Sequence, residues 1–437
     1  MSDLFKLLLI GDSDSQLLAC EALCRFPSDL NVQVTINAIP REGTPDSILQ
    51  RAAALGDLWR LDMGQLLTHS ELLHFDAIGV YLTGSKISDF RLALGLLPSR
   101  ERPLLFCGFN GVVLEKFMEG MSWRLGYDLV CLSGPRDREA LDRMLEGSPF
   151  AGQRTVLTGL HRQEISDDQL LDQQQRRKQL VFAEQVVMPS NPIDRAEMVR
   201  ILADLARRSP DWEVLIKPRI APGETTFHSI KDHISTTLLQ TLGHPPDNLR
   251  FDYRALPDLL RQARLMATIS STAFFDALDM GCRPLVIADF GINPANGSHV
   301  FAGSGVWRCL DEVEDLDALD HSLPSPDADW LAWMGYGTNL DPVELIEALR
   351  QLRADPPERL STTSGYLSNA NLSFTQLRRD AERAIRQKNW QEAQSLLQLG
   401  SLMRPTHRNV ARRSRAVQHR NRIIRRLLLS LTYRDVG

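Results

Sequence analysis

The sequence contains no run of about 18 consecutive apolar residues, the length that a membrane-spanning helix requires. Its first residues, MSDLFKLLLIGDSDS, hold an apolar run that is too short for a secretory signal. None of its six cysteines forms a Cys-x-x-Cys pair, which argues against a zinc site or a redox site. These absences lead us to expect a globular protein located in the cytoplasm.

Acidic residues are missing from Ala393 to Arg434, a segment that carries ten arginines. The whole chain has a formal net charge of −5, so the remainder is acidic. A basic tail on an acidic body predicts an anionic surface as a partner. With Ile423, Ile424 and 427–429, the tail can lie on an anionic membrane, peripheral at its inner face, or pack as a solvated helix on the body. Tyr433 is its only aromatic residue, which argues against nucleic-acid binding.

Short apolar runs alternate with segments of helical periodicity in two consecutive parts of the chain. The apolar runs cover 4–10, 32–36, 77–82, 103–107 and 129–132, and then 180–182, 212–216, 249–251, 265–269 and 284–287. Strand and helix in alternation predict parallel sheets with helices on both faces. We therefore expect an α/β protein with two facing Rossmann-like, doubly wound domains, whose ligands bind at the carboxyl ends of the strands.

The polar and flexible stretches of the chain set the expected domain boundaries. We predict a first domain over 1–160, a polar linker over 161–179 and a second domain over 180–354. A second linker is expected over 355–372, because it is rich in Pro, Ser, Thr and Asn. Residues 373–437 are predicted to form a small α-helical extension, with one tetratricopeptide-like hairpin and the basic tail.

The first apolar run ends in Gly-Asp-Ser, the beginning of one class of serine esterases. Such an esterase also needs a general base, supplied by an Asp-x-x-His pair, and no histidine here has an aspartate three residues before it. The interpretation that remains is that Asp12 or Asp14 acts as a general base toward an acceptor hydroxyl. Capping of the following helix by Asp12 or Ser13 is the alternative.

The stretch VLIKPRIAPGETTFH places Lys217 and Arg219 just after a predicted strand, ahead of Glu224 and His228. Two cations at the end of a strand suit a phosphate or a carboxylate. Glu224 is included among the donor-binding candidates, and His228 could donate a proton to a leaving phosphate. A surface loop with ordinary charges is the alternative, and for Glu224 it carries equal weight.

The stretch ATISSTAFFDALDMG leads from a predicted strand into a predicted helix through Ser270, Ser271 and Thr272. Hydroxyls and free N–H groups at the N-terminus of a helix form an anion site. Helix capping by Ser270 or Ser271 is the alternative, and it is compatible with phosphate binding. Asp289 follows the next predicted strand, is expected at the same edge of the sheet, and is included among the donor-binding candidates.

These motifs resemble a bacterial family of glycosyltransferases that is known as a domain of unknown function. The resemblance keeps its order over about residues 5 to 310 and is carried by DSDS at 12–15, RPLLFCGFNG at 102–111, FAEQVVMP at 182–189, KPRIAPGETTFH at 217–228, SSTAFFDAL at 270–278, and ADFG at 288–291 with FAGSG at 301–305. The family is similar to two-domain enzymes of the GT-B type, including sialyltransferases and Kdo transferases. In those enzymes a hydroxyl pair that Ser270 and Ser271 match binds the donor phosphate.

The resemblance implies a glycosyltransferase of bacterial surface polysaccharide synthesis that takes a nucleotide sugar, CMP-linked in the sialyl and Kdo types. We expect a glycan or a lipid-linked acceptor to bind at Thr83, Gly84, Asn110 and Gly111. No cofactor is expected. We also expect no metal, because the one Asp-x-Asp spacing considered, 12–14, lies in the presumed acceptor domain. A nucleotide-sugar epimerase and a non-catalytic sugar-binding or assembly protein are the alternatives.

Overall fold

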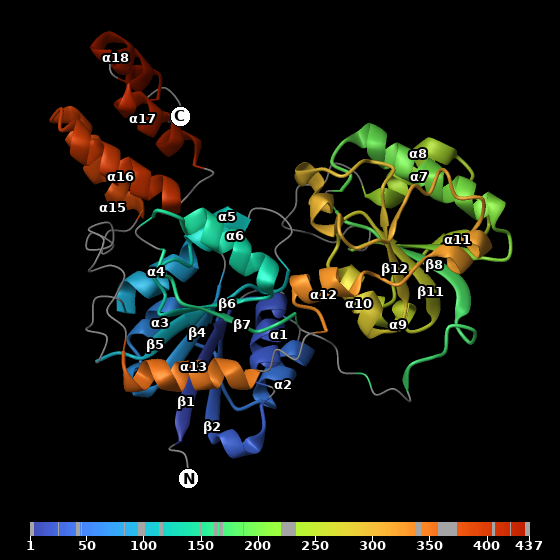
Figure 1. The fold of residues 1–437 in the computed structure, drawn as a ribbon, viewed down its shortest axis with the longest axis horizontal. Helices are drawn as coiled ribbons and strands as arrows, with labels where there is room; N and C mark the ends of the chain where they lie inside the picture. The colour runs from blue at the N-terminus through green and yellow to red at the C-terminus, as the bar shows by residue number, and fades with distance from the viewer. Residues whose placement is uncertain are drawn as a thin grey trace. The chain divides into compact units, whose positions relative to one another are not determined.

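The structure is a computed structural model that describes residues 4–24, 26–40, 44, 46–82, 84–94, 101–112, 117–148, 151–160, 165, 169–186, 188–219, 233–337, 342–356, 374–403, 407–419 and 421–432. The chain divides into two compact units (Figure 1). Unit 1 consists of Met1–Leu160 and Thr338–Gly437, and unit 2 consists of His161–Gly337.

Unit 1 is built on a parallel sheet with the strand order β3-β2-β1-β4-β5-β6-β7. Its strands are β1 (Phe5–Gly11), β2 (Val32–Ala38), β3 (Asp57–Trp59), β4 (Ala77–Tyr81), β5 (Leu104–Cys107), β6 (Leu129–Leu132) and β7 (Thr155–Leu157). The strand order reverses between β1 and β4, which pair in parallel. Such a reversal is the position where open α/β sheets bind their ligands, at the carboxyl ends of the strands.

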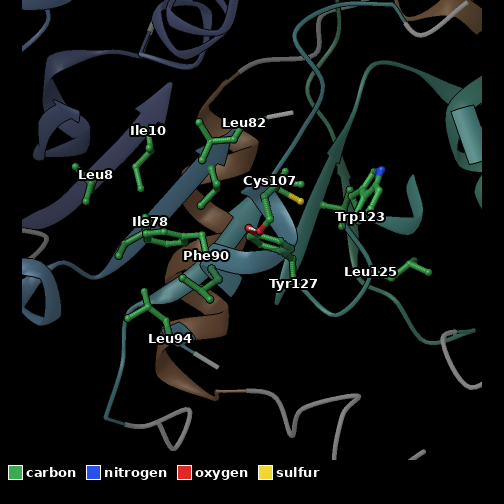
Figure 2. Packing of buried hydrophobic residues seen from close by; sticks show 14 of the residues in the cluster. Leu8, Ile10, Ile78, Leu82, Phe90, Leu94, Cys107, Trp123, Leu125 and Tyr127 are labelled. Atoms are coloured by element: carbon green, nitrogen blue, oxygen red, sulfur yellow. Dashed lines mark hydrogen bonds between the residues drawn. The ribbon is translucent and has the colours of Figure 1, made fainter. Parts of the chain in front are cut away.

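The helices of unit 1 cover both faces of this sheet (Figure 1). They are α1 (Asp14–Leu23), α2 (Asp46–Ala53), α3 (Met63–Leu67), α4 (Ser85–Leu94), α5 (Phe117–Ser122), α6 (Pro135–Leu145) and α13 (Pro342–Ala354). Alternate residues of β1 enter different cores: Leu8 and Ile10 join one cluster, shown in Figure 2, and Leu7 and Leu9 join the other. The unbroken apolar run of β1 follows from this burial on both faces.

Helix α13 belongs to unit 1, although the sequence predicts a second domain that extends to residue 354. Leu345, Ile346 and Leu349 are fully buried in the same cluster as Leu7. The periodic apolar side of a helix requires a sheet to pack on, but it does not indicate which sheet provides the contact. The structure therefore moves 342–354 out of the predicted second domain.

Unit 2 contains a second parallel sheet with the strand order β10-β9-β8-β11-β12-β13. Its strands are β8 (Arg177–Ala183), β9 (Glu213–Lys217), β10 (Leu249–Phe251), β11 (Ala263–Thr268), β12 (Arg283–Ile287) and β13 (Trp307–Arg308). Its helices are α7 (Pro192–Arg208), α8 (Ile234–Leu242), α9 (Leu256–Leu260), α10 (Ala273–Asp279), α11 (Leu316–Ser322) and α12 (Ala328–Met334). The order reverses between β8 and β11, so both units are Rossmann-like and the predicted α/β class is confirmed.

The sequence predicts a linker over 161–179, but strand β8 begins inside it. Arg176, just before β8, is buried and donates to the carbonyl oxygens of Leu260 and Ala263 at 3.0 and 3.2 Å. The polar composition of this segment predicted a linker. In the structure, however, its Arg176 guanidinium bonds to backbone carbonyl oxygens of unit 2 and so attaches the segment to that unit. Residues 357–372 of the second predicted linker lie outside the described residues.

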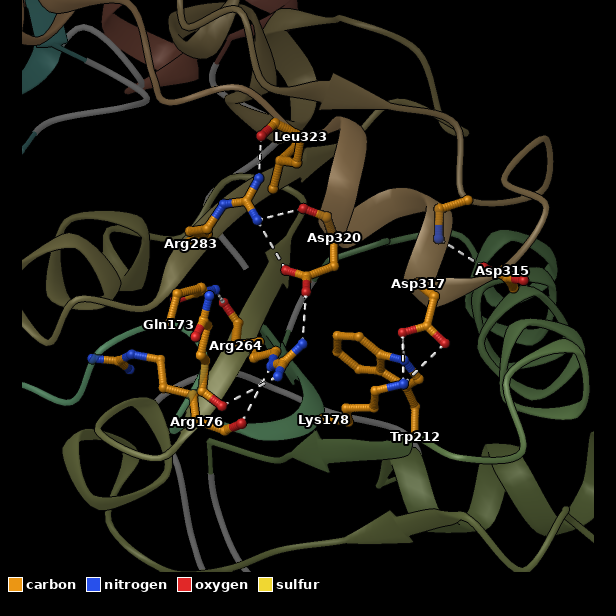
Figure 3. Close-up of polar contacts among 12 residues, drawn as sticks. Gln173, Arg176, Lys178, Trp212, Arg264, Arg283, Asp315, Asp317, Asp320 and Leu323 are labelled. Atoms are coloured by element: carbon orange, nitrogen blue, oxygen red, sulfur yellow. Dashed lines mark hydrogen bonds and ion pairs between the residues drawn. The ribbon is translucent and has the colours of Figure 1, made fainter.

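Two carboxylates of helix α11 bind basic side chains at the N-terminal edge of the unit 2 sheet (Figure 3). Asp320 accepts from Arg264, near the start of β11, at 3.1 Å, and from Arg283, at the start of β12, at 2.9 Å. Asp317 pairs with Lys178 of β8 at 2.8 Å and accepts from the indole of Trp212 at 3.1 Å. The ends of three strands are thus fixed to one helix, and the opposite edge is the candidate for ligand binding.

The predicted α-helical extension is confirmed, and it consists of α15 (Phe374–Arg386), α16 (Trp390–Met403), α17 (Arg408–Gln418) and α18 (Arg422–Leu431). These four helices share one apolar cluster, with Phe374, Leu397, Val410 and Leu429 among its members. The likeness of α15 and α16 to a tetratricopeptide hairpin stays a prediction. Among the described residues, no helix has the length and apolar character needed to cross a bilayer.

Candidate functional site

Asp12 directly follows β1, at the edge of unit 1 where the strand order reverses. Its backbone N–H donates to the side-chain oxygen of Gln16 at 2.6 Å, and its side chain is buried. A Cβ at Gly11 would lie 3.2 Å from the side chains of Gln16 and Leu17, so a glycine there lets α1 approach the strand closely. The turn that follows β1 thus holds a carboxylate at the candidate edge.

Lys86 pairs with Asp12 across this edge, with 2.5 Å between Nζ and Oδ2. It lies in the first turn of α4, and its side chain is 57% exposed, whereas that of Asp12 is 3% exposed. Sequence reasoning missed Lys86, although it stands three residues after Thr83 in the predicted acceptor loop. The lysine fixes the position of the buried carboxylate, which is what a general base that contacts an acceptor hydroxyl requires.

Asp14 occupies a different environment from Asp12. It is exposed in the first turn of α1, where a negative charge interacts favourably with the helix dipole. Ser13 stands at the N-cap position, but its side chain makes no capping hydrogen bond. The Ser13 hydroxyl therefore does not cap α1, and the two candidate bases, Asp12 and Asp14, differ in burial.

The predicted acceptor residues lie after β4 and β5, except Thr83, which falls outside the described residues. Gly84 is exposed with φ of +56°, a conformation that favours glycine. Gly111 is exposed as well. The side-chain oxygen of Asn110 is buried and has no hydrogen-bond partner among the described residues. It is therefore an acceptor that a hydroxyl ligand could satisfy.

Two consecutive residues after β8 hold the neighbouring strands at the candidate edge of unit 2. Glu184 is buried, pairs with Arg195 at 3.0 Å, and accepts from the backbone N–H of Arg219 at 3.4 Å. Gln185 accepts from the backbone N–H of Ser270 at 3.0 Å and donates to its hydroxyl at 3.2 Å. Sequence reasoning missed both roles, because neither residue belongs to a phosphate-binding pattern.

The three predicted hydroxyls before α10 have different surroundings. Ser270 is 2% exposed, and its hydroxyl donates to the carbonyl oxygen of Asn296. Ser271 is half-buried, and its hydroxyl accepts from the backbone N–H of Ala273 at 3.2 Å. Thr272 is exposed, and its side chain makes no capping bond. Ser270 thus holds the loop in place, and Thr272 offers its hydroxyl to solvent.

Lys217 ends β9, and Arg219 follows it with an exposed side chain. The Lys217 ammonium is half-buried and donates to the carbonyl oxygen of Pro218 at 2.7 Å. Both cations therefore lie at the C-terminal edge, as the sequence predicts. Glu224 and His228 lie outside the described residues.

Two aspartates near the same edge have contrasting functions in the fold. Asp289 accepts from the backbone N–H groups of Leu310 and Asp311 at 2.9 and 3.0 Å, so it ties the β12 exit to the segment after β13. Asp276 lies in the first turn of α10, where burial and the charge of Asp279 raise its pKa to about 6. Strongly shifted carboxyl groups in such positions are functional candidates.

Within the part of the chain that the structure describes, no three His, Cys, Asp or Glu side chains group so that they could hold a metal ion. Metal-independent chemistry stays a prediction, because Glu224 and His228 lie outside the described residues.

A family model matches residues 7–352 and carries the description "Putative glycosyltransferase (DUF6716)". The chain belongs to this family. The matched part includes both sheets and ends near the close of α13, which packs on unit 1. The helices α15 to α18 lie beyond it. No curated protein matches the sequence.

Several solved structures are similar to this chain at low sequence identity. One is described as a "putative UDP-N-acetylglucosamine 2-epimerase from Listeria monocytogenes"; it is 16% identical, covers 82% of this chain and 99% of its own, and has a TM-score of 0.49. MnaA of S. aureus with UDP is 12% identical, with coverages of 81% and 99% and a TM-score of 0.47. MurG of Acinetobacter baumannii is 9% identical, with coverages of 79% and 99% and a TM-score of 0.42.

Proposed function

We propose that this protein is a glycosyltransferase that moves a sugar from a nucleotide-sugar donor to a hydroxyl group of a glycan or of a lipid-linked acceptor. The observation that carries the proposal is the family match, which covers both Rossmann-like sheets and their strand-order reversals. We propose that unit 2 holds the donor and unit 1 the acceptor. Synthesis of bacterial surface polysaccharide is the proposed setting, and CMP-linked sugars are the first donors to test.

The donor phosphate is proposed to bind at the edge of unit 2. Lys217 and Arg219 supply positive charge at the end of β9, and Thr272 supplies an exposed hydroxyl before α10. Ser271 can share its hydroxyl between a backbone N–H and a ligand, since an oxygen has two lone pairs. Ser270 is assigned a positioning role, because its hydroxyl already bonds to Asn296 and Gln185. Charge neutralisation by side chains would make the transfer independent of metal.

We assign the acceptor side to unit 1, with Asp12 as the general base. Asp12 is buried at the sheet edge, and Lys86 holds its carboxylate from the first turn of α4. Asn110, with its buried side-chain oxygen, is proposed to accept a hydrogen bond from a second acceptor hydroxyl. Asp14 is less suitable as the base, because it is exposed in the first turn of α1, where water solvates its carboxylate.

A thermal-shift series with CMP-, UDP-, GDP- and dTDP-linked sugars tests the donor site. A ligand at a hundred times its dissociation constant stabilises the protein by about 2.7 kcal/mol, which a melting experiment resolves. Thr272→Ala combined with Arg219→Ala should abolish the shift that the correct donor gives. Arg207→Ala is the matched control, because Arg207 is an exposed arginine in the last turn of α7.

Product analysis with and without an acceptor then identifies the reaction. Transfer that requires the acceptor supports the proposal. An epimerised nucleotide sugar formed without acceptor would assign the chain to epimerase chemistry instead. A donor-dependent shift without turnover in the presence of cell glycans would assign it a binding role, and unchanged shifts in the double variant would refute the donor site.

A further inference from the structure

Helix α18 presents a row of large apolar side chains to solvent. Ile423, Ile424, Leu427 and Leu431 are 80%, 41%, 60% and 52% exposed. Their spacing of one, four and eight residues places them on one side of the helix. Adjacent large apolar side chains on one side of an exposed helix mark a surface that binds a partner or an apolar medium.

The opposite side of α18 is packed, which fixes the orientation of the apolar row. Leu429 is buried in the cluster shared by α15 to α18. The guanidinium of Arg425 stacks over the Trp390 ring at 4.6 Å and donates to the carbonyl oxygen of His419 at 2.9 Å. Thr432 is buried and accepts from Arg413 at 3.3 Å. The helix therefore cannot turn its apolar row inward without losing these contacts.

Exposed arginines accompany the apolar row. Arg422 and Arg426 lie one helical turn apart on α18, beside the apolar row. On α17 the exposed arginines are Arg408, Arg412 and Arg415. The buried arginine of α17, Arg413, pairs with Glu382 at 2.6 Å. The sequence carries no acidic residue from Ala393 to Arg434, so no carboxylate within α17 or α18 offsets the positive charge.

We propose that α18 docks the protein on an anionic lipid bilayer, with its apolar row in the headgroup and acyl boundary and its arginines on the lipid phosphates. A helix with large apolar residues on one side and arginines on its flank is the type that lies in this interface. Anionic leaflets attract such basic segments, and the attraction weakens with salt. The proposal is independent of the donor site and of the reaction.

The alternatives fit the same observations less well. A symmetric contact between two copies through this row would bring the arginines of both copies together. Binding of single-stranded nucleic acid usually involves aromatic side chains that stack on the bases. The described residues of α17 and α18 contain no aromatic side chain, so this surface does not suit nucleic acid. An anionic bilayer offers phosphates to the arginines and an apolar medium to the apolar row.

Flotation of the full chain with vesicles tests the proposal. We expect binding to vesicles of phosphatidylcholine with phosphatidylglycerol, little binding to phosphatidylcholine alone, and loss of binding at high salt. Ile423→Ser with Leu427→Ser should weaken binding about tenfold or more. Arg422→Gln with Arg426→Gln should weaken it about tenfold and reduce its salt dependence. All four side chains are exposed, so the melting temperature should stay unchanged.

Matched controls come from other exposed helices. Leu239→Ser on α8 changes a leucine that is 60% exposed, as Leu427 is, and Arg143→Gln on α6 changes an arginine that is 74% exposed. Neither should alter flotation. Absence of binding to anionic vesicles would overturn the proposal, and so would equal losses in the controls. Sedimentation velocity showing a dimer that Ile423→Ser with Leu427→Ser dissociates would assign the row to self-association and overturn it too.

Discussion

The two sheet edges have the same topology and different chemistry. In unit 1 the reversal between β1 and β4 carries an ion pair, with a buried Asp12 and a solvated Lys86. In unit 2 the reversal between β8 and β11 carries a neutral network of Gln185 and Ser270, beside the buried pair of Glu184 and Arg195. One edge presents a buried carboxylate with its lysine partner, and the other presents amides, hydroxyls and cations.

This difference shows that the strand order only marks where a ligand can bind. The chemistry depends on which side chains leave the strands there. An acid at the unit 1 edge suits the activation of a hydroxyl group, and cations with a hydroxyl at the unit 2 edge suit an anion. The same scaffold therefore supports the two different halves of the proposed transfer.

The largest expected effect concerns the acid of unit 1. Asp12→Asn should lower turnover by about 10²- to 10⁴-fold, because the amide cannot accept the acceptor proton. The thermal shift produced by the donor should persist, since the donor site is assigned to unit 2. Asp14→Asn is the control and should change turnover only a few-fold. Retained activity in Asp12→Asn together with a loss in Asp14→Asn would reverse the assignment.

Removing one partner of each ion pair compares the two edges directly. Arg195→Met leaves Glu184 buried without its cation and should lower the free energy of unfolding by about 3–5 kcal/mol. Lys86→Met also leaves a buried carboxylate without its cation, but the lysine is 57% exposed, so the loss should be smaller, about 1–3 kcal/mol. Urea denaturation measures both changes. Similar losses in the two variants would contradict the idea that the exposure of the cation sets the size of the loss.

The hydroxyls of Ser270 and Thr272 in unit 2 are expected to have different roles, the first in stability and the second in donor binding. Ser270→Ala leaves the Asn296 carbonyl without its hydroxyl donor, so the free energy of unfolding should fall by about 1–3 kcal/mol. Thr272→Ala should leave the free energy of unfolding unchanged, because this side chain is exposed and makes no capping bond. It should weaken the binding of the nucleotide-sugar donor. Calorimetric titration of the donor, paired with melting of the free proteins, checks both. A donor affinity that falls only in Ser270→Ala would contradict these roles.

The smallest effect concerns the pH dependence of unit 2. Asp276 has a pKa raised to about 6 in the fold, above its value of 3.8 as an ordinary aspartate. The fold therefore prefers the protonated form, and this contribution to stability is full below pH 3.8 and lost as the pH rises to about 6. Asp276→Asn should raise the free energy of unfolding by about 1–3 kcal/mol at pH 8 and by little at pH 3.5. An effect that does not change with pH would contradict this interpretation.

Much of the fold could be predicted from local pattern. The apolar run of β1 and the run that becomes β11 predicted parallel strands, and the positions of Lys217 and Thr272 after such runs predicted a common edge. Lys86 could not be predicted as the partner of Asp12, because the two residues are 74 positions apart and only the adjacency of β1 and β4 joins them. The role of Gln185 could not be predicted for the same reason, because its hydrogen-bond partner Ser270 is 85 positions away in the sequence.

The sequence by itself determined the two series of strands and helices, the positions of polar residues after the strands, and the basic tail with its apolar residues. Those features depend on periodicity and composition, which are local properties. Only the tertiary structure decided that α13 packs on unit 1, that Ser270 is used inside the loop, and that α18 turns its apolar row to solvent. Each of these depends on which distant surface a side chain meets, and a local pattern carries no information about that surface.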